Sequence, residues 1–306
     1  MAILITGASG FLGTALIERL LQKGHRIYGL SRHPPKEKEN LIPLVGDITE
    51  ANLGLGAVPK DIDCIYHLAG SHRLGEDKDG QIWRTNVDGT QNILAFCVLH
   101  DISKLYFTST AYTLGRNPYE LSKIKNEEAV NYYKDIYGLK VTIFKPSVVL
   151  GTETYFYPGH FSQFVSLVIK IHQRAELIRR KIEGTLRLPV IEPVFRIRGN
   201  PKGKANLVRV DTVVEAIATI DKEGTFWLTN SNPPTLGRLF EWVGEFIMIR
   251  IKLEPEFKPT PIEATFQKMT SAFEPYAQGD NFCSDLKHCP RITKSFIQNT
   301  IKQALG

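Results

Sequence analysis

The chain has few cysteines and no long hydrophobic run. Its four cysteines, Cys64, Cys97, Cys283 and Cys289, lack the paired spacing of a zinc site or a disulfide framework, so we expect no metal. No segment approaches the roughly 20 apolar residues that span a bilayer. A strand-like run begins at Ala2 and leaves no room for a cleavable signal. These absences favour a cytoplasmic protein without a membrane span.

The chain also lacks a large excess of charge of one sign. Its 38 Lys and Arg residues nearly balance its 32 Asp and Glu residues, which gives a net charge of +6. No nucleic-acid-binding module accompanies this small surplus, so we expect no nucleic-acid partner and only a preference for anionic ligands. No internal repeat, low-complexity tract or flexible linker interrupts the 306 residues. With 42% hydrophobic and 23% charged residues, the chain can bury a full core as one large α/β unit or two joined lobes.

Strand-like and helix-like segments alternate over the first half of the chain. Periodicity and breakers predict strands at 2–6, 26–30, 41–45, 62–68, 104–109 and 141–145, and helices at 10–23, 81–99 and 119–137. This alternation predicts an α/β fold with a doubly wound parallel Rossmann sheet, whose ligand lies at the carboxyl ends of the strands.

The pattern loosens after Gly151 and returns as a helix at 208–220 and a strand at 226–229. We therefore predict a dinucleotide-binding Rossmann domain over residues 1–151 and 205–230. A smaller C-terminal substrate-binding lobe is expected over 152–204 and 231–306.

A glycine turn follows the first expected strand, in the run Thr6-Gly7-Ala8-Ser9-Gly10-Phe11-Leu12-Gly13. Gly7 allows the tight turn, Gly10 lets the backbone approach a pyrophosphate, and Gly13 lets the helix pack closely on the sheet. The helix N-terminus then faces the phosphates. A glycine-rich turn without a ligand is the alternative, but the position at the first strand–helix turn favours a dinucleotide site.

The second expected strand ends in Ser31-Arg32-His33, without a carboxylate. An acidic residue there would hydrogen-bond the ribose 2′-hydroxyl of NAD and repel a 2′-phosphate. The planar guanidinium of Arg32 suits a phosphate instead, unless it is an ordinary solvated arginine. We predict NADP(H) as the cofactor, with NAD as the alternative.

Tyr119 and Lys123 are four residues apart in an expected helix, so they share one face of it. An adjacent cation favours the phenolate, and such a tyrosine can exchange a proton with a substrate oxygen. A Tyr-x-x-x-Lys string alone is usually a solvated pair. In this order and separation from the glycine turn, it predicts a nicotinamide-dependent oxidoreductase.

These two motifs together resemble the extended branch of the short-chain dehydrogenase/reductase superfamily, which holds epimerases, dehydratases and reductases. The resemblance covers residues 2–151 and returns near 208–230. It implies catalytic roles for Tyr119 and Lys123, and for a hydroxyl that orients the substrate at the end of the fifth strand. Alignment on Gly115 makes Thr110 that hydroxyl, with Ser109 as the alternative.

The resemblance also implies a set of cofactor contacts from the ends of successive strands. It places Asp47 and Ile48 at the adenine and the loop 67–70 beneath the nicotinamide. It makes Asn86 an active-site residue and places the backbone of residues 146–148 at the carboxamide. His67 is expected to be packed and not to donate a proton. The complete expected set is Gly7, Ser9, Gly10, Phe11, Leu12, Gly13, Ser31, Arg32, Asp47, Ile48, Leu68, Ala69, Gly70, Asn86, Thr108, Lys123, Pro146, Ser147 and Val148.

The chain departs from the family pattern at two places. Only nine positions separate Thr110 from Tyr119, where extended members carry a longer loop, so we expect an open cleft or one closed by the aromatic residues 155–157. Ala111 and Tyr112 also stand where sugar dehydratases have acidic residues, which disfavours elimination chemistry.

The substrate is less constrained by the sequence. Residues 196–211 resemble the segment before the returning helix in fatty acyl and thioester reductases, the male-sterility-like group, although epimerases share part of it. Three hypotheses compete: an NADP(H)-linked aldehyde, ketone or acyl-thioester reductase, a nucleotide-sugar epimerase with tightly bound NAD, and a non-catalytic dinucleotide-sensing protein.

A basic stretch is either a solvated face or a binding surface for a phosphate-bearing small molecule. Its only acidic residues are Glu183 and Glu192. Its basic residues are Arg179, Arg180, Lys181, Arg187, Arg196, Arg198, Lys202 and Lys204. Relatives often form homodimers through their fourth and fifth helices, and a homodimer is a further expectation.

Overall fold

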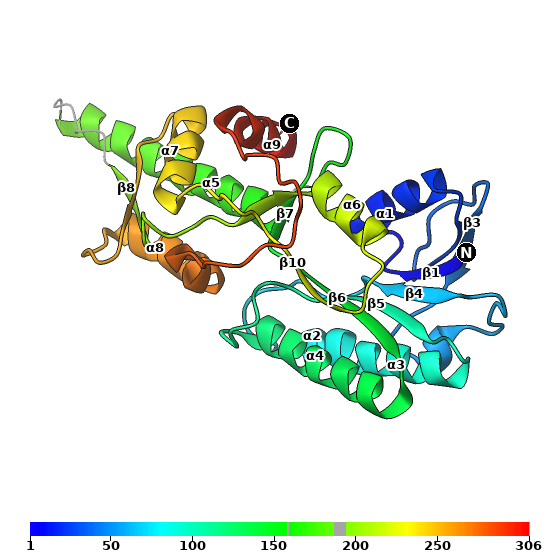
Figure 1. Cartoon of the computed structure of the whole chain (residues 1–306). Coiled ribbons are helices and arrows are strands. Elements are labelled where there is room, and N and C mark those ends of the chain that lie inside the picture. Colours follow the sequence, from blue (N-terminus) through cyan, green and yellow to red (C-terminus); the bar gives the residue numbers. More distant parts are fainter. Residues whose placement is uncertain (158, 187–193, 306) are drawn as a thin grey trace. The chain divides into compact units, whose positions relative to one another are not determined.

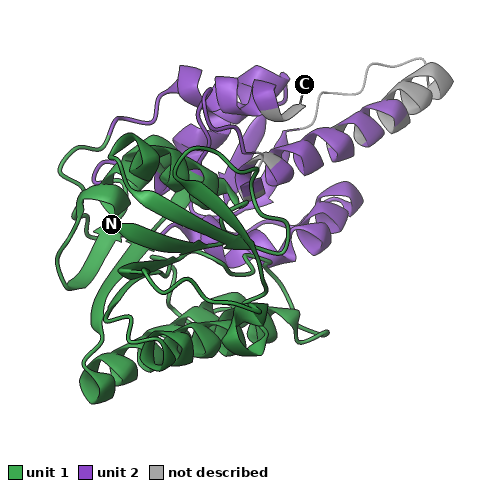
Figure 2. Ribbon diagram, turned by 90° about the vertical axis from the view of Figure 1, so that its right-hand side faces the viewer, with its two compact units in different colours: residues 1–149, 208–230, 283–289 green, residues 150–207, 231–282, 290–306 purple. Residues whose placement is uncertain are grey.

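The chain divides into two units, each assembled from segments that are distant in the sequence (Figure 2). The computed structural model describes residues 1–157, 159–186 and 194–305. The first unit comprises residues 1–149, 208–230 and 283–289, and the second comprises 150–207, 231–282 and 290–306. The expected domains, 1–151 with 205–230 and 152–204 with 231–306, stay predictions; in this division residues 283–289 belong to the first unit.

A seven-stranded parallel sheet forms the centre of the first unit (Figure 1). Its order is β10-β6-β5-β4-β1-β2-β3, so the chain starts in the middle and winds outward in both directions. The predicted doubly wound sheet is confirmed. The strands are β1 (Ala2–Thr6), β2 (Arg26–Ser31), β3 (Leu41–Val45), β4 (Cys64–His67), β5 (Lys104–Thr108), β6 (Lys140–Pro146) and β10 (Gly224–Leu228).

Helices cover both faces of this sheet, which explains why every residue of β1 is buried. On one face, α1 (Phe11–Gln22) packs against α6 (Val210–Thr219). On the other face, α3 (Gly89–Leu99) packs against α4 (Pro118–Tyr137). The short 3-10 helix η1 (Ala51–Gly54) contacts α3.

The helix expected over 81–99 is not continuous. It consists of α2 (Gln81–Trp83), a π-helical turn η2 (Arg84–Asp88), and then α3. A π turn admits one extra residue and re-aims the side chains beside it, and such turns are frequent at functional sites. This one contains Asn86, which is 1% exposed.

The start and end of α4 are both marked in the sequence. The Asn117 side chain accepts a hydrogen bond from Glu120 N at 3.0 Å, and Pro118 occupies the first turn. Gly138 ends the helix with a φ of 67°, a left-handed conformation that favours glycine. The orientation of α4 is therefore set at both ends, and this helix carries Tyr119 and Lys123.

The second unit is mainly helical and has an aromatic core. The Phe164 ring lies 5.6, 5.6 and 5.7 Å from those of Phe240, Phe266 and Phe273. β8 (Phe195–Arg198) and β11 (Ile251–Glu254) pair in parallel. The helices are α5 (Gly159–Leu186), α7 (Leu236–Ile247), α8 (Pro261–Met269), η3 (Ser271–Gln278) and α9 (Lys294–Leu305). Two short strands, β7 (Val148–Leu150) and β9 (Leu207–Arg209), pair where the sequence changes unit.

Residues 283–289 return to the first unit because they hydrogen-bond to β10 and the residue after it. Asp285 N donates to Trp227 O at 2.9 Å, and Trp227 N donates to the Asp285 carboxylate at 2.7 Å. Ser284 Oγ donates to Thr229 O at 2.7 Å. Single backbone and side-chain contacts of this kind leave no periodic pattern, so the sequence did not predict them.

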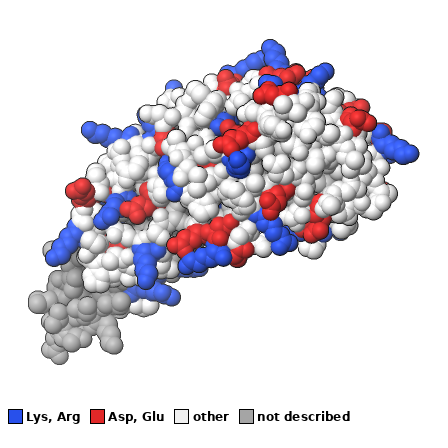
Figure 3. All heavy atoms as spheres, turned by 90° about the horizontal axis from the view of Figure 1, so that it is seen from below, with Lys and Arg blue, Asp and Glu red and all other residues white. Residues whose placement is uncertain are grey.

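The described ranges contain neither a membrane-spanning helix nor a metal-binding group of side chains. Within them, no helix combines the length and apolarity that a bilayer crossing requires. No group of three or more His, Cys, Asp or Glu in those ranges is arranged to hold a metal ion. On the face shown in Figure 3, basic and acidic side chains are interspersed among uncharged ones.

Candidate functional site

The residues expected to bind a dinucleotide gather at one edge of the sheet in the first unit. Most of them lie at the carboxyl ends of β1, β2, β3, β4, β5 and β6, which meet at one edge because the strands are parallel, and Asn86 reaches Gly70 from η2. Tyr119 and Lys123 join them from α4. One fold feature therefore brings together segments that are more than a hundred residues apart.

The glycine turn between β1 and α1 is closely packed. Gly7 has a φ of 71°, and a Cβ at that position would lie 2.8 Å from Ala69 N, so the turn touches the loop Leu68–Gly70. A Cβ at Gly13 would lie only 2.1 Å from Gly7 O. The helix that starts after Gly10 has no side-chain cap at its N-terminus, where the helix dipole favours an anion. This geometry fits the pyrophosphate of a dinucleotide.

The end of β2 lies beside this turn. Ser9 Oγ donates to Ser31 Oγ at 3.1 Å, and the next residue, Arg32, is exposed. After β3, the Asp47 carboxylate accepts hydrogen bonds from Thr49 N and Thr49 Oγ1, both at 2.9 Å, and so closes its own turn. No acidic side chain takes the position at the end of β2 where a carboxylate would favour NAD.

His67 is a buried structural residue. It is 1% exposed, its Nδ1 lies 2.7 Å from Thr6 Oγ1, and its Nε2 lies 3.2 Å from Thr90 Oγ1. Burial, with a smaller contribution from Lys123, lowers the pKa of His67 to about 3, so the ring is neutral at physiological pH. Thr6 Oγ1 also accepts from Ala69 N at 3.2 Å. The network ties β1, β4 and α3 together at the cofactor loop.

A chain of hydrogen bonds connects the π turn to α4. The Asn86 side chain binds both backbone groups of Ser71. Its Oδ1 accepts from Ser71 N at 2.6 Å, and its Nδ2 donates to Ser71 O at 3.0 Å. Its amide also donates to Ser122 Oγ at 2.8 Å, and Ser122 Oγ donates to Tyr119 O at 2.7 Å. Sequence analysis missed Ser122, although its position within the Tyr119–Lys123 segment was a signal. Asn86 thus fixes both the loop after β4 and the turn of α4 that carries Tyr119.

Adjacent hydroxyls after β5 have different partners. The Thr110 side chain is the neighbour that lowers the pKa of the Tyr119 phenol. Ser109 Oγ donates instead to the Glu127 carboxylate. The backbone holds this arrangement, since Ser109 N donates to Phe144 O and Ala111 N to Pro146 O, both at 2.8 Å. This geometry supports Thr110 over Ser109 as the hydroxyl paired with the tyrosine.

The pKa of Tyr119 is shifted in the direction opposite to our expectation. Burial raises the pKa of the phenol to about 12, more than the Thr110 hydrogen bond lowers it. Lys123 is 7% exposed, and its burial lowers the pKa of its ammonium to about 8. Lys123 Nζ donates to Thr108 O at 3.2 Å and lies 5.6 Å from the centre of the Phe107 ring. The phenol is therefore neutral at physiological pH and suited to donate a proton.

The short loop between β5 and α4 is held by a buried ion pair. The Glu120 side chain is fully buried and accepts from Leu114 N at 3.1 Å and from Arg116 N at 3.0 Å. The Arg116 guanidinium donates to the same carboxylate at 2.8 Å and lies over the Tyr112 ring at 5.7 Å. Glu120, which follows Tyr119 directly, thus ties the loop to the start of α4.

Ser147 follows β6 and is 6% exposed. Its backbone N donates to Leu228 O at 3.3 Å. Its hydroxyl has no hydrogen-bond partner among the described residues. An unsatisfied buried hydroxyl next to a cofactor-binding edge is compatible with a ligand contact from Pro146, Ser147 and Val148.

Part of the basic stretch is already neutralised within the second unit. The Arg196 guanidinium donates to Glu263 at 2.9 and 3.0 Å and lies 4.5 Å from the centre of the Phe257 ring. Arg198 lies 3.6 Å from Glu274. Lys202 and Lys204 are exposed. Arg187 and Glu192 fall outside the described residues, as do the side chains of Arg179, Arg180, Lys181 and Glu183.

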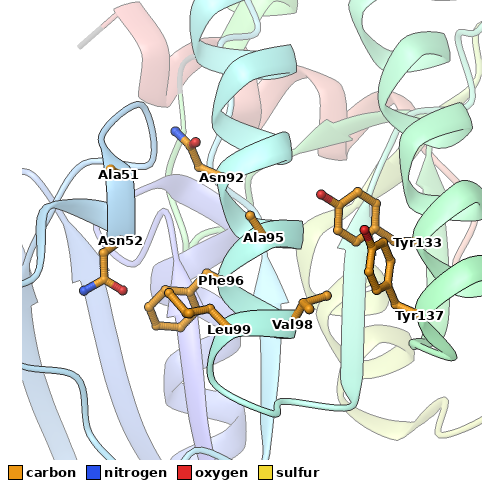
Figure 4. A pocket seen from close by; sticks show the side chains of 9 residues that line it. All are labelled: Ala51, Asn52, Asn92, Ala95, Phe96, Val98, Leu99, Tyr133 and Tyr137. Carbon is orange, nitrogen blue, oxygen red and sulfur yellow. The ribbon is translucent and has the colours of Figure 1, made fainter.

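A hollow of about 440 Å³ lies on the first unit between η1, α3 and α4 (Figure 4). None of the residues that form it belongs to the expected dinucleotide site. Its lining is largely apolar and aromatic: Ala51, Asn52, Asn92, Ala95, Phe96, Val98, Leu99, Tyr133 and Tyr137.

Known proteins with similar sequences include both reductases and epimerases. The 2-alkyl-3-oxoalkanoate reductase of Stenotrophomonas maltophilia is 31% identical over 137 residues, which is 44% of this chain and 41% of the relative. The UDP-glucose 4-epimerase of Halalkalibacterium halodurans is 29% identical over 162 residues, 46% and 48% of the two chains. The matches thus span less than half of these curated relatives.

Similar solved structures establish the same fold. The terminal R domain of the myxalamid PKS-NRPS pathway has a TM-score of 0.71 at 21% identity, with coverage of 99% of this chain and 90% of the other. The family model of NAD-dependent epimerases and dehydratases matches residues 3–220, from β1 to the residue that follows α6. The chain therefore belongs to the NAD-dependent epimerase/dehydratase family, as the resemblance to extended short-chain dehydrogenases indicated.

Proposed function

We propose that this protein is an NADP(H)-dependent reductase that converts an aldehyde, ketone or acyl thioester into an alcohol or aldehyde. The observation that carries the proposal is the placement of Tyr119 and the buried Lys123 on one face of α4, with Thr110 as the neighbour that lowers the pKa of the phenol. The phenol is neutral at physiological pH, because burial raises its pKa to about 12, and it therefore holds the proton that a carbonyl oxygen receives on reduction.

Each side chain of the catalytic set has a distinct role in this proposal. Thr110 orients the substrate oxygen beside the phenol, and Tyr119 gives that oxygen its proton. Lys123, on the same face of α4, supplies positive charge next to the phenolate that remains. When bound, the nicotinamide supplies the hydride that the carbonyl carbon receives.

The residues around the glycine turn support a phosphorylated cofactor. Arg32 is exposed beside Ser31 and can bind a 2′-phosphate through its planar fork. Ser31 lies within hydrogen-bond distance of Ser9 in the glycine turn, so the two loops form one surface. NADP(H) is therefore proposed in preference to NAD.

A nucleotide-sugar epimerase is the second candidate, because the family and the epimerase relative support it as well. An epimerase of this kind reduces and reoxidises a tightly held NAD within one turnover. The exposed Arg32 at the end of β2, where a carboxylate would favour NAD, supports an exchangeable NADP(H) instead. A non-catalytic dinucleotide sensor would not need the Thr110–Tyr119–Lys123 arrangement.

Two measurements test the proposal. NADPH oxidation is followed with a panel of aldehydes, ketones, acyl thioesters and nucleotide sugars, and Tyr119→Phe serves as the inactive control. The ultraviolet spectrum of the purified protein shows whether a dinucleotide is retained. Turnover of a carbonyl compound with exchangeable NADPH supports the reductase, whereas retained NAD and interconversion of nucleotide sugars would establish the epimerase instead.

A further inference from the structure

A buried polar cluster that the proposed reaction does not use lies one helical turn from Lys123 in the first unit. The Glu127 carboxylate is at its centre and accepts from Ser109 Oγ and from Lys145 Nζ, the latter at 2.9 Å. Ser109 is 4% exposed, and the side chains of Glu127 and Lys145 are 21% and 6% exposed. The cluster joins α4 to β6 and to the residue after β5.

Lys145 is a buried cation whose contacts are all inside this cluster or beside it. Its ammonium also donates to Thr113 Oγ1 at 3.0 Å and lies 4.8 Å from the centre of the Trp227 ring on β10. A buried ammonium is costly unless it is paired and hydrogen-bonded. Glu127 provides that partner, so Lys145 in turn fixes the direction of the Glu127 side chain.

Glu127 faces a second cation, because residues four apart lie on one face of a helix. It is four residues after Lys123, and its charge raises the pKa of the Lys123 ammonium against the larger effect of burial. The other titratable groups around Lys123 are Tyr119 on the same helix and His67 on β4, which is neutral. Glu127 is thus the source of negative charge for Lys123.

We propose that Glu127 is a positioning residue for the catalytic set: it holds Ser109, and with it the adjacent Thr110, and it places a negative charge on the face of α4 that carries Lys123. Lys145 helps to hold the Glu127 carboxylate beside Ser109 and neutralises part of its charge. The inference rests on the proposed function, since it assigns Glu127 a role through Thr110 and Lys123 and gives it no contact with substrate.

Glu127→Gln tests this role, with Glu128→Gln as the matched control. Glu128 is the next residue on α4, but its side chain is 60% exposed and pairs with Lys125 at 3.0 Å. The titration of Lys123 is followed by NMR of isotope-labelled lysine, assigned with Lys123→Arg. The pH dependence of kcat/KM is measured in parallel with NADPH and the best carbonyl substrate.

We expect the Lys123 titration and the alkaline limb of kcat/KM to move to lower pH in Glu127→Gln, with kcat lower by roughly ten- to hundredfold through misplacement of Thr110. Glu127→Asp, which keeps the charge, should retain the position of the limb. Lys145→Gln should move the limb to higher pH, because it removes a competing cation. Opposite shifts at two neighbouring residues are not produced by general destabilisation.

A Lys123 titration in Glu127→Gln that matches that of Glu128→Gln would overturn the proposal. If Glu127→Gln does not fold, the upward shift expected in Lys145→Gln decides instead. If the wild-type protein reduces no carbonyl compound, the proposed function fails, while the NMR titration still tests the coupling between Glu127 and Lys123.

Discussion

Thr110 is the neighbour that lowers the pKa of the Tyr119 phenol, although the two residues lie at opposite ends of a nine-residue step in the sequence. Their proximity supports Thr110 as the orienting hydroxyl. We expect Thr110→Ala to lower kcat by roughly a hundredfold, as does removal of a hydrogen-bond donor at other reacting oxygens. Thr110→Ser should restore most of the rate. Initial rates with saturating NADPH measure both variants.

Ser109→Ala is the comparison for this prediction and should reduce kcat less than Thr110→Ala. Its hydroxyl serves Glu127 and not the phenol. A larger loss in Ser109→Ala than in Thr110→Ala would mean that Ser109 is the orienting hydroxyl.

Tyr119→Phe should abolish turnover and leave the affinity for NADPH nearly unchanged. The substitution removes only the proton donor, whose contribution is about 10²- to 10⁴-fold. Lys123→Ala should instead impair both turnover and cofactor binding. Fluorescence titration of NADPH and single-turnover rates separate the two effects, and activity close to wild type in Tyr119→Phe would refute the catalytic assignment.

Arg32→Ala should remove a preference for NADPH over NADH. A charge-assisted contact to the 2′-phosphate corresponds to about ten- to hundredfold in affinity. Lys36→Ala is a suitable control, because Lys36 is an exposed cation in the same segment after β2. Equal affinities of the wild-type protein for the two cofactors would contradict the NADP(H) proposal.

Lys123→Met should stabilise the fold at pH 7 while it abolishes activity. The pKa of Lys123 falls from 10.5 to about 8 on folding, so the folded protein carries a buried charge below pH 8 at a cost on the order of 3 kcal/mol. Between pH 8 and 10.5 the unfolded chain binds more protons, so the wild-type protein gains stability as pH rises.

The gain in melting temperature of Lys123→Met should accordingly shrink as pH is raised from 7 towards 10. Lys125→Met, which changes an exposed lysine on the same helix, should show neither effect. A Lys123→Met variant that melts below the wild type at pH 7 would show that the contacts of the ammonium outweigh its desolvation.

A homodimer is the remaining expectation from the sequence, and the exposed apolar residues of the first unit favour α3 and α4 as its surface. Leu99, Tyr137 and Ile136 are 69%, 53% and 61% exposed on these neighbouring helices, and two of them border the hollow in Figure 4. Apolar side chains of this size on one surface favour association. Leu99→Glu should convert a dimer into a monomer in sedimentation velocity, whereas Met248→Glu, at an 86% exposed residue of the second unit, should not. A wild-type monomer would refute the prediction.

The strands and the glycine turn could be predicted because each depends on local residues. β1 and β3 begin and end where their apolar runs do, and the order of strands and helices gave the parallel sheet. The second unit was harder, because its helices have mixed faces and its core depends on contacts such as Phe164 with Phe266, about a hundred residues apart.

The sequence predicted those parts of the candidate site that lie in recognisable motifs. Helical spacing identified Tyr119 and Lys123, but spacing carries no information on burial, and burial determines both of their pKa values. Glu127 and Lys145 were missed because their relation exists only once β6 lies beside α4. The choice between Ser109 and Thr110 also depended on three-dimensional direction, which the alignment on Gly115 could not supply.

The ion pair between Arg116 and Glu120 has a consequence for engineering this protein. Because Glu120 holds the backbone at Leu114 and Arg116, the short loop keeps its path when side chains elsewhere on it are exchanged. Its two ends carry Thr110 and Tyr119, so substitutions at Tyr112, whose backbone N donates to Thr110 Oγ1, should change the side chain next to the proposed site without moving Tyr119. Substrate scope could then be varied at one position, provided that Glu120 is left intact.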